Sequence, residues 1–102
     1  MVNYIDVKDS NSAEEFKNVR DNGQWFVWFH ATWCGHCRAM DEEWDNLVKN
    51  NNTSIKLAKV ESEFIDKNKD TNILGFPTLR LFTNSKLTDY NSGRDLESFQ
   101  NF

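Results

Sequence analysis

The pentapeptide Trp33-Cys34-Gly35-His36-Cys37 holds the only two cysteines of this chain, separated by two residues. It follows a strongly apolar run, Trp25-Phe26-Val27-Trp28-Phe29, and precedes a charged segment with helical periodicity. Cysteines three positions apart at the start of a helix lie about one turn apart, so their sulfur atoms can reach each other. This spacing, between a strand-like and a helix-like segment, is typical of a redox-active cysteine pair.

The residues of this motif have chemical roles that follow from their types and positions. If Cys34 occupies the first turn of the helix, free backbone N–H groups and the helix dipole favour its thiolate, the form that attacks disulfides. Cys37 then releases a mixed disulfide formed at Cys34. Gly35 leaves room for an approaching substrate chain. A protonated His36 stabilises the thiolate, which makes the disulfide a stronger oxidant.

Two other interpretations of the cysteines are weaker. A structural zinc site needs four ligands, and only His30 and His36 could join Cys34 and Cys37. An inert disulfide would close a very short loop and would constrain the unfolded chain little. We therefore expect a catalytic pair and no metal site.

Length and composition narrow the class of protein. The 102 residues suffice for a single domain, residues 1–102, which is either a short protein or a domain cut from a longer chain. A net charge of −4 and a pI near 5.1 give no sign of a nucleic-acid-binding surface. No apolar stretch is long enough to cross a bilayer, and the first residues lack the pattern of a secretory signal.

The first half of the chain alternates strands and helices. Tyr4-Ile5-Asp6-Val7 predicts a short strand, and Ser12-Ala13-Glu14-Glu15 matches a capping box that begins a helix ending near Asp21. The apolar run at residues 25–30 predicts a strand buried on both faces. From Cys34 to about Lys49 the pattern is helical, with an apolar stripe formed by Cys37, Met40, Trp44, Leu47 and Val48.

The second half of the chain adds further strands. Residues 55–60 alternate as a strand, residues 64–69 predict a short helix, and residues 78–82 and 87–90 predict a hairpin. Asp95 is a suitable cap for a last helix. This order of elements predicts an α/β sandwich with helices on both faces of a central sheet.

Four segments of the chain, in the same order, resemble the catalytic domains of protein disulfide isomerases, which are members of the thioredoxin superfamily. They are residues 33–37, Lys56-Leu57-Ala58-Lys59-Val60, Gly75-Phe76-Pro77-Thr78-Leu79-Arg80-Leu81-Phe82 and Tyr90-Asn91-Ser92-Gly93-Arg94. The resemblance covers almost the whole chain. It implies the thioredoxin fold, an α/β fold with a central mixed sheet and helices on both faces.

The resemblance also implies a function, that of a thiol–disulfide oxidoreductase and isomerase acting on unfolded or disulfide-containing proteins. The redox group would be the Cys34–Cys37 disulfide, with no metal or organic cofactor. Glutathione or a redox partner protein would recycle it, and we expect a monomer with no nucleic-acid or membrane partner. The family implies the endoplasmic reticulum lumen or secretory pathway, while the absence of a signal pattern leaves the cytosol as the alternative.

The resemblance assigns roles to four residues around the cysteine pair. The family's proline at the place of Pro77 is cis and lies against the cysteines, so that the residue at Phe76 presents its backbone to an extended substrate. Trp33 and Phe76 would form an apolar rim beside the thiols, suited to unfolded chains. The arginine matching Arg94 is thought to swing in and lower the pKa of the second cysteine, and we carry that role to Arg94.

Trp28 is the main departure from the family, which usually has a buried acid there to take and return the proton of the second cysteine. An indole cannot act as that base. We therefore expect slow deprotonation of Cys37 and long-lived mixed disulfides, unless His30, on the same strand face, substitutes as the base. Lys59, which normally accompanies the acid, is expected to pair with Glu61 or to turn outward to water.

A second departure concerns prolines. Thr32 stands where a proline is common before the Trp-Cys pair. Glu42 replaces the proline that kinks the second helix in the family, so we expect that helix to run straighter.

Two rival functions remain open at this point. A thioredoxin-like disulfide reductase would suit a reducing compartment, but His36 argues against it because a stabilised dithiol is a poor reductant. A substrate-binding or chaperone module would retain unfolded chains on the surface of Trp33 and Phe76, with its redox activity weakened by Trp28.

Overall fold

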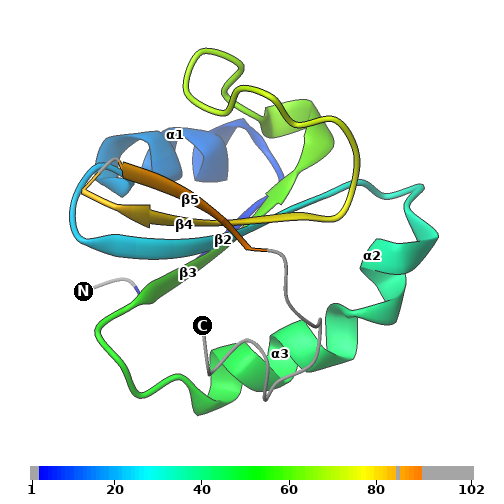
Figure 1. Ribbon diagram of the computed structural model, residues 1–102, viewed down its shortest axis with the longest axis horizontal. Coiled ribbons are helices and arrows are strands. Elements are labelled where there is room, and N and C mark those ends of the chain that lie inside the picture. The colour runs from blue at the N-terminus through cyan, green and yellow to red at the C-terminus, as the bar shows by residue number, and fades with distance from the viewer. Residues whose placement is uncertain (1–2, 85, 91–102) are drawn as a thin grey trace.

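The structure is a computed structural model, and it describes residues 3–84 and 86–90. Apart from the short helix predicted at residues 64–69, its elements follow the predicted order as far as the hairpin (Figure 1). The last predicted helix, from Asp95, lies outside the described residues. The elements are β1 (Tyr4–Val7), α1 (Ser10–Val19), β2 (Gln24–His30), α2 (Gly35–Ala39), α3 (Asp41–Asn50), β3 (Lys56–Glu61), the 3-10 helix η1 (Ser62–Phe64), β4 (Thr78–Thr83) and β5 (Lys86–Tyr90).

The five strands form one mixed sheet in the order β1-β3-β2-β4-β5. Strand β3 runs parallel to both β1 and β2, whereas β4 is antiparallel to β2 and to β5. Figure 1 shows α1 on one side of this sheet and α2 with α3 on the other. The predicted α/β sandwich around a central mixed sheet is therefore confirmed. No helix within the described ranges is long and apolar enough to cross a membrane.

Strand β2 divides the core into two halves, because successive side chains point to opposite faces of a sheet. Trp25, Val27 and Phe29 join the cluster that α1 covers, together with Phe16 from that helix. Trp28 joins the other cluster, with the buried residues of α2 and α3. The continuous apolar run in the sequence is thus explained by a strand that is buried on both sides, as predicted.

Helix α1 begins one turn earlier than the sequence pattern suggested. Asp9 is its N-cap, and its carboxylate accepts the Ser12 N–H at 2.8 Å while Ser12 Oγ accepts the Asp9 N–H at 3.1 Å. The prediction that Ser12 caps the helix in a box with Glu15 was wrong. Asp9 lies two residues after the end of β1 and is itself a favoured capping residue, so the helix begins at this earlier cap.

The second helix is interrupted, contrary to the straight helix expected from Glu42. The backbone of Met40 leaves the helical region, at φ −99° and ψ 0°, and separates α2 from α3. Its N–H donates to the Cys37 carbonyl only three residues back, at 3.2 Å, which tightens the turn. The bend therefore forms without a proline. The predicted apolar stripe is confirmed, since Trp44 and its neighbours on that stripe pack against the sheet.

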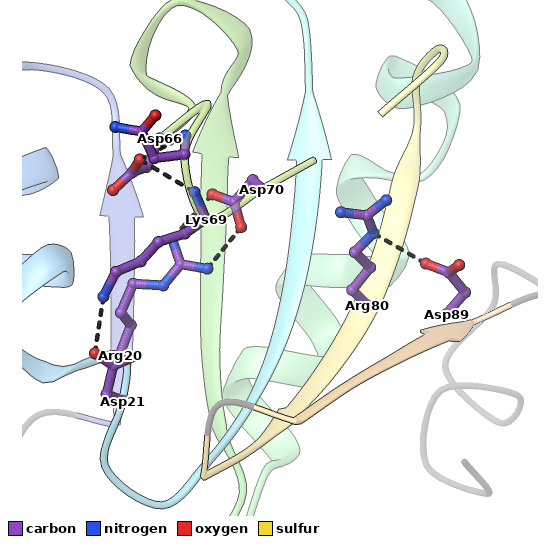
Figure 2. Close-up of polar contacts among 8 residues, drawn as sticks. Arg20, Asp21, Asp66, Lys69, Asp70, Arg80 and Asp89 are labelled. Atoms are coloured by element: carbon purple, nitrogen blue, oxygen red, sulfur yellow. Dashed lines mark hydrogen bonds and ion pairs between the residues drawn. The ribbon is translucent and has the colours of Figure 1, made fainter. Parts of the chain in front are cut away.

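The loop between η1 and β4 replaces the short helix predicted at residues 64–69. Asp66 Oδ1 accepts the backbone N–H groups of Asn68 and Lys69, so its side chain competes with helix formation. Further along, the carboxylate of Asp70 binds the guanidinium of Arg20, the C-cap of α1 (Figure 2). This buried pair ties the loop to the helix on that face of the sheet.

Candidate active site

The two cysteines lie at the start of α2 and are joined in a disulfide. Cys34 is the N-cap residue, and its Sγ accepts the Cys37 N–H at 3.1 Å. The side chains are buried, with Cys34 6% and Cys37 2% exposed. In the reduced protein a backbone N–H aimed at this sulfur favours the thiolate, so the placement predicted from the sequence supports nucleophilic attack by Cys34.

The two residues between the cysteines face solvent. A Cβ added at Gly35 would meet no described atom within 4 Å, so the approach to the pair is open on this side and glycine is not required there for packing. His36 is also exposed. Its effect on the reduction potential stays a prediction.

An apolar rim stands next to the disulfide. Trp33 is 73% exposed, and its ring makes an edge contact with Phe76 at a centroid distance of 5.7 Å. That contact brings the loop before β4 against the residue that precedes Cys34. The peptide bond between Phe76 and Pro77 is cis, as the resemblance implied.

Sequence reasoning missed Leu74, which is 97% exposed just before this rim. Leu74, Phe76 and Pro77 line a cavity of about 570 Å³ together with residues of β4 and β5. The available signal was the apolar pair Ile73-Leu74 directly before the Gly75-Phe76-Pro77 segment, after the polar stretch at residues 66–72. Leu74 thus adds an exposed apolar side chain to the loop that carries Phe76.

Trp28 fills the core position at which the family usually has an acid. It is fully buried and packs against Trp44 at a ring-centroid distance of 5.3 Å. The Lys59 ammonium lies over the Trp28 ring, 4.8 Å from its centroid, and binds Asp41 Oδ1 at 3.1 Å. Both expectations for Lys59 were wrong, because α3 begins with a carboxylate beside it while Glu61 accepts the Glu63 N–H instead.

A cavity of about 210 Å³ lies beside the second cysteine, and its lining includes Cys37, His30, Asp41 and Lys59. Burial, and then the nearby Lys59 charge, lower the pKa of His30 below its ordinary value of 6.5. Its imidazole is therefore neutral at pH 7. Sequence reasoning pointed to His30 but missed Asp41, because no pattern signals a contact with a residue 18 positions away.

Other predictions for the site have separate outcomes. Arg94 lies outside the described residues, so its role stays a prediction. Across residues 3–84 and 86–90, no group of three or more His, Cys, Asp or Glu side chains is placed to hold a metal ion.

Comparison with known proteins supports the resemblance. The family model for thioredoxin matches residues 6–102. A thioredoxin domain-containing protein of Theileria parva is 38% identical over 82 residues, which is 78% of this chain and 37% of that protein. Protein disulfide-isomerase 1 of Caenorhabditis elegans is 36% identical over 81 residues, covering 76% of this chain and 16% of the relative.

A solved structure gives the same result. The first two thioredoxin domains of Eps1p from Naumovozyma dairenensis superpose with a TM-score of 0.74 and 25% identity, covering 85% of this chain and 36% of that one. The chain spans about a third or less of these proteins. Together with the Cys34–Cys37 disulfide, these matches support thiol–disulfide exchange as the chemistry of this domain. The chain belongs to the thioredoxin family, and its relatives include protein disulfide isomerases.

Proposed function

We propose that this domain oxidises thiols to disulfides and isomerises disulfides in protein substrates, in the manner of a protein disulfide isomerase. The observation that carries the proposal is the Cys34–Cys37 disulfide at a helix N-cap, with the Cys37 N–H on Cys34 Sγ, beside the exposed Trp33 ring. A reactive sulfur at a helix start supports exchange chemistry. An exposed aromatic next to it supports substrates with accessible apolar side chains.

The exchange proceeds through one mixed disulfide. In the oxidising direction a substrate thiolate attacks Cys34 Sγ, the bond to Cys37 breaks, and Cys37 leaves with the electron pair. A second substrate thiolate then attacks the substrate sulfur of the mixed disulfide and releases Cys34 as a thiolate. Isomerisation uses the reduced pair, with Cys34 attacking a substrate disulfide and Cys37 releasing the enzyme from unproductive adducts.

The remaining components of the proposal follow the family and the motif. The Cys34–Cys37 pair is the redox group, without a metal or organic cofactor, and glutathione or a redox partner protein recycles it. His36 keeps the dithiol stable and so favours oxidation of substrates. A monomer in the endoplasmic reticulum lumen or secretory pathway fits this use, and the cytosol is the alternative compartment.

The first test is the equilibrium reduction potential of the pair, measured in glutathione buffers with thiol trapping. A potential of about −180 to −210 mV, which matches the redox potential of the endoplasmic reticulum, supports an oxidase and isomerase. A potential near about −270 mV would overturn that assignment in favour of a thioredoxin-like reductase. Recovery of a scrambled disulfide protein, with Cys34→Ser as the inactive control, tests isomerisation directly.

A second candidate function is a substrate-binding module. Its support is the exposed Trp33 ring in contact with the half-buried Phe76, an apolar surface that does not depend on redox chemistry. The Cys34→Ser/Cys37→Ser double variant separates the two functions in an aggregation assay on a reduced, unfolded protein. Protection retained by the double variant but lost on adding Trp33→Ala supports binding in its own right, and no protection by either refutes it.

A further inference from the structure

A cavity gives the buried thiol of the pair access to titratable groups. Cys37 is only 2% exposed, yet it lines the cavity of about 210 Å³ described above. Other elements complete the wall, with His30 from the end of β2, Lys59 from β3 and Asp41 from the start of α3. Cys37 must lose its proton before it can attack a mixed disulfide at Cys34. This cavity therefore gives the thiol proton a path to an acceptor.

His30 is the side chain lining this cavity whose ring has an unpartnered nitrogen. Its Nε2 is buried and has no hydrogen-bond partner among the described residues. Its ring packs on Trp28 at a centroid distance of 5.2 Å, which holds the imidazole at the end of the strand. His30 also lines a neighbouring cavity of about 370 Å³, whose charged lining residues are Asp6, Lys8, Lys59, Glu61 and Glu63. The imidazole thus lines both the cavity of Cys37 and a neighbouring cavity that charged residues help to line.

The other members of the first cavity are less suited to accept a proton. Arg38, which also lines this cavity, carries a guanidinium that can only donate hydrogen bonds. The carboxylate of Asp41 is already bound to Lys59 at 3.1 Å and is half exposed at its side chain. The Lys59 ammonium is a donor without an acceptor site.

We propose that His30 accepts the thiol proton of Cys37, relayed through water in this cavity, when Cys37 releases a substrate from Cys34. The proposal rests on the thiol–disulfide exchange of the proposed function. It assigns the role of the family's missing acid to a residue at the end of the same strand. Release is then governed by His30 and is faster than the slow release expected from Trp28 alone.

The charges around His30 suit this role. Burial is the largest cause that lowers its pKa, followed by the Lys59 ammonium, whereas Asp6, Glu61 and Asp41 act in the opposite direction with smaller effects. The imidazole is therefore neutral and able to accept a proton at pH 7. As the pH falls below 6.5 and reaches the lowered pKa, the imidazole becomes protonated and the acceptor is lost.

The step balances as a two-electron exchange. Cys37 S–H gives its proton to the imidazole, and the resulting thiolate attacks Cys34 Sγ. The new Cys34–Cys37 bond forms as the bond between Cys34 and the substrate sulfur breaks, and the substrate leaves as a thiolate with the electron pair. The Cys34–Cys37 pair is thereby oxidised and the substrate disulfide is reduced. The imidazolium afterwards returns its proton to water.

The test isolates this step with oxidised glutathione as the substrate. Reduced protein is mixed with glutathione disulfide and quenched with acid, and intact mass gives the glutathione adduct and the oxidised protein over time. Adduct formation reports attack by Cys34, and adduct decay reports release by Cys37. His30→Gln keeps a polar side chain of similar size but cannot take a proton. We expect its adduct to decay at least about 100-fold more slowly, since a positioned base typically contributes about 10²–10⁴-fold.

The pH profile separates proton transfer from a structural effect. Wild-type adduct decay should slow below an inflection that lies under pH 6.5, and His30→Gln should lack that inflection. Lys59→Met removes a cation and should shift the inflection to higher pH, whereas Asp41→Asn removes an anion and should shift it to lower pH. A purely structural effect would not shift the inflection in opposite directions. The comparison of Lys59→Met with Asp41→Asn therefore tests the proposal even if His30→Gln folds poorly.

Each remaining outcome has a definite meaning. If the adduct forms normally and its decay has the same rate and pH profile in His30→Gln, the proton goes elsewhere and the proposal for His30 is overturned. Loss of adduct decay in Asp41→Asn, with the inflection retained in His30→Gln, would identify the carboxylate as the acceptor and overturn it as well. If no adduct forms in the wild type, thiol–disulfide exchange itself fails, which is a different result.

Discussion

Removing one partner of the buried Arg20–Asp70 ion pair should cost about 3–5 kcal/mol, because the other charge is left buried without a counter-ion. Arg20 Nη1 donates to Asp70 Oδ2 at 2.9 Å and Nη2 donates to Oδ1 at 2.6 Å (Figure 2). The side chains are only 5% and 1% exposed. The guanidinium also lies over the rings of Phe16 and Phe82, at 4.9 and 5.0 Å from their centroids. Asp70→Asn would leave this charge without its counter-ion in a mostly apolar site.

A neighbouring ion pair offers a matched control. Lys69 Nζ binds Asp21 Oδ2 at 2.8 Å, so it also joins the loop to the end of α1 (Figure 2). Its side chains are 38% and 55% exposed, and a solvent-exposed pair contributes only about 0–1 kcal/mol. We therefore expect Lys69→Met to have a small effect, although it cuts a contact between the same two segments.

Urea unfolding of the oxidised protein, followed by tryptophan fluorescence, measures both changes. Domains of this kind have a total stability of about 5–15 kcal/mol, so the expected loss for Asp70→Asn moves the midpoint strongly. The double variant Arg20→Met/Asp70→Leu should recover most of the loss, because apolar replacement of a buried pair is often neutral or stabilising. If Asp70→Asn costs no more than Lys69→Met, the burial argument is refuted.

Three further predictions concern other parts of the chain. Asp9→Ala removes the N-cap of α1 and should cost about 1 kcal/mol in urea unfolding, whereas the exposed Glu15→Ala should stay within about 0.5 kcal/mol. Burial and then the charge of Asp6 raise the pKa of Tyr4 to about 12 from 10.0. The folded state therefore keeps a proton that the unfolded state loses, so stability should fall as the pH rises from 10 toward 12, and urea midpoints of Tyr4→Phe should lack this fall. Trp33→Ala should reduce activity on an unfolded protein about tenfold while leaving the reaction with oxidised glutathione unchanged, and equal losses with both substrates would argue against an apolar binding role.

The fold could be predicted from the sequence because its strongest signals are local. A continuous apolar run at residues 25–30 identifies the central strand. The spacing of Cys34 and Cys37 places the two residues one helical turn apart, within reach of each other. The start of α1 was misplaced because Asp9 and Ser12 are both favoured caps three residues apart. The capping propensities of Asp9 and Ser12 do not decide between the two helix starts, whereas the position where β1 ends does.

The surroundings of Cys37 could not be predicted because they depend on contacts between distant segments. The break at Met40 sets the position of Asp41, and the partner of Asp41 is Lys59, 18 residues later on β3. Sequence patterns report which face a residue occupies, but not which charge of another element lies opposite. Likewise nothing local marks Arg20 as the partner of Asp70, 50 positions away, although this pair fixes the loop that leads toward the cis-proline.

The presence of Trp28, where the family usually has a buried acid, favours the stability of the core but removes a proton acceptor. A carboxylate at this place would have to be desolvated in the core, which costs free energy unless it is paired. An indole instead packs against Trp44 and beneath the Lys59 ammonium and contributes apolar burial. The Lys59 ammonium pairs instead with Asp41 at the edge of the core, where water can screen this ion pair. His30 occupies the same edge, so the chain combines an apolar core strand with a titratable group at the end of that strand. The domain should therefore be more stable than its Trp28→Glu variant, and that variant should no longer depend on His30 for release of its substrate.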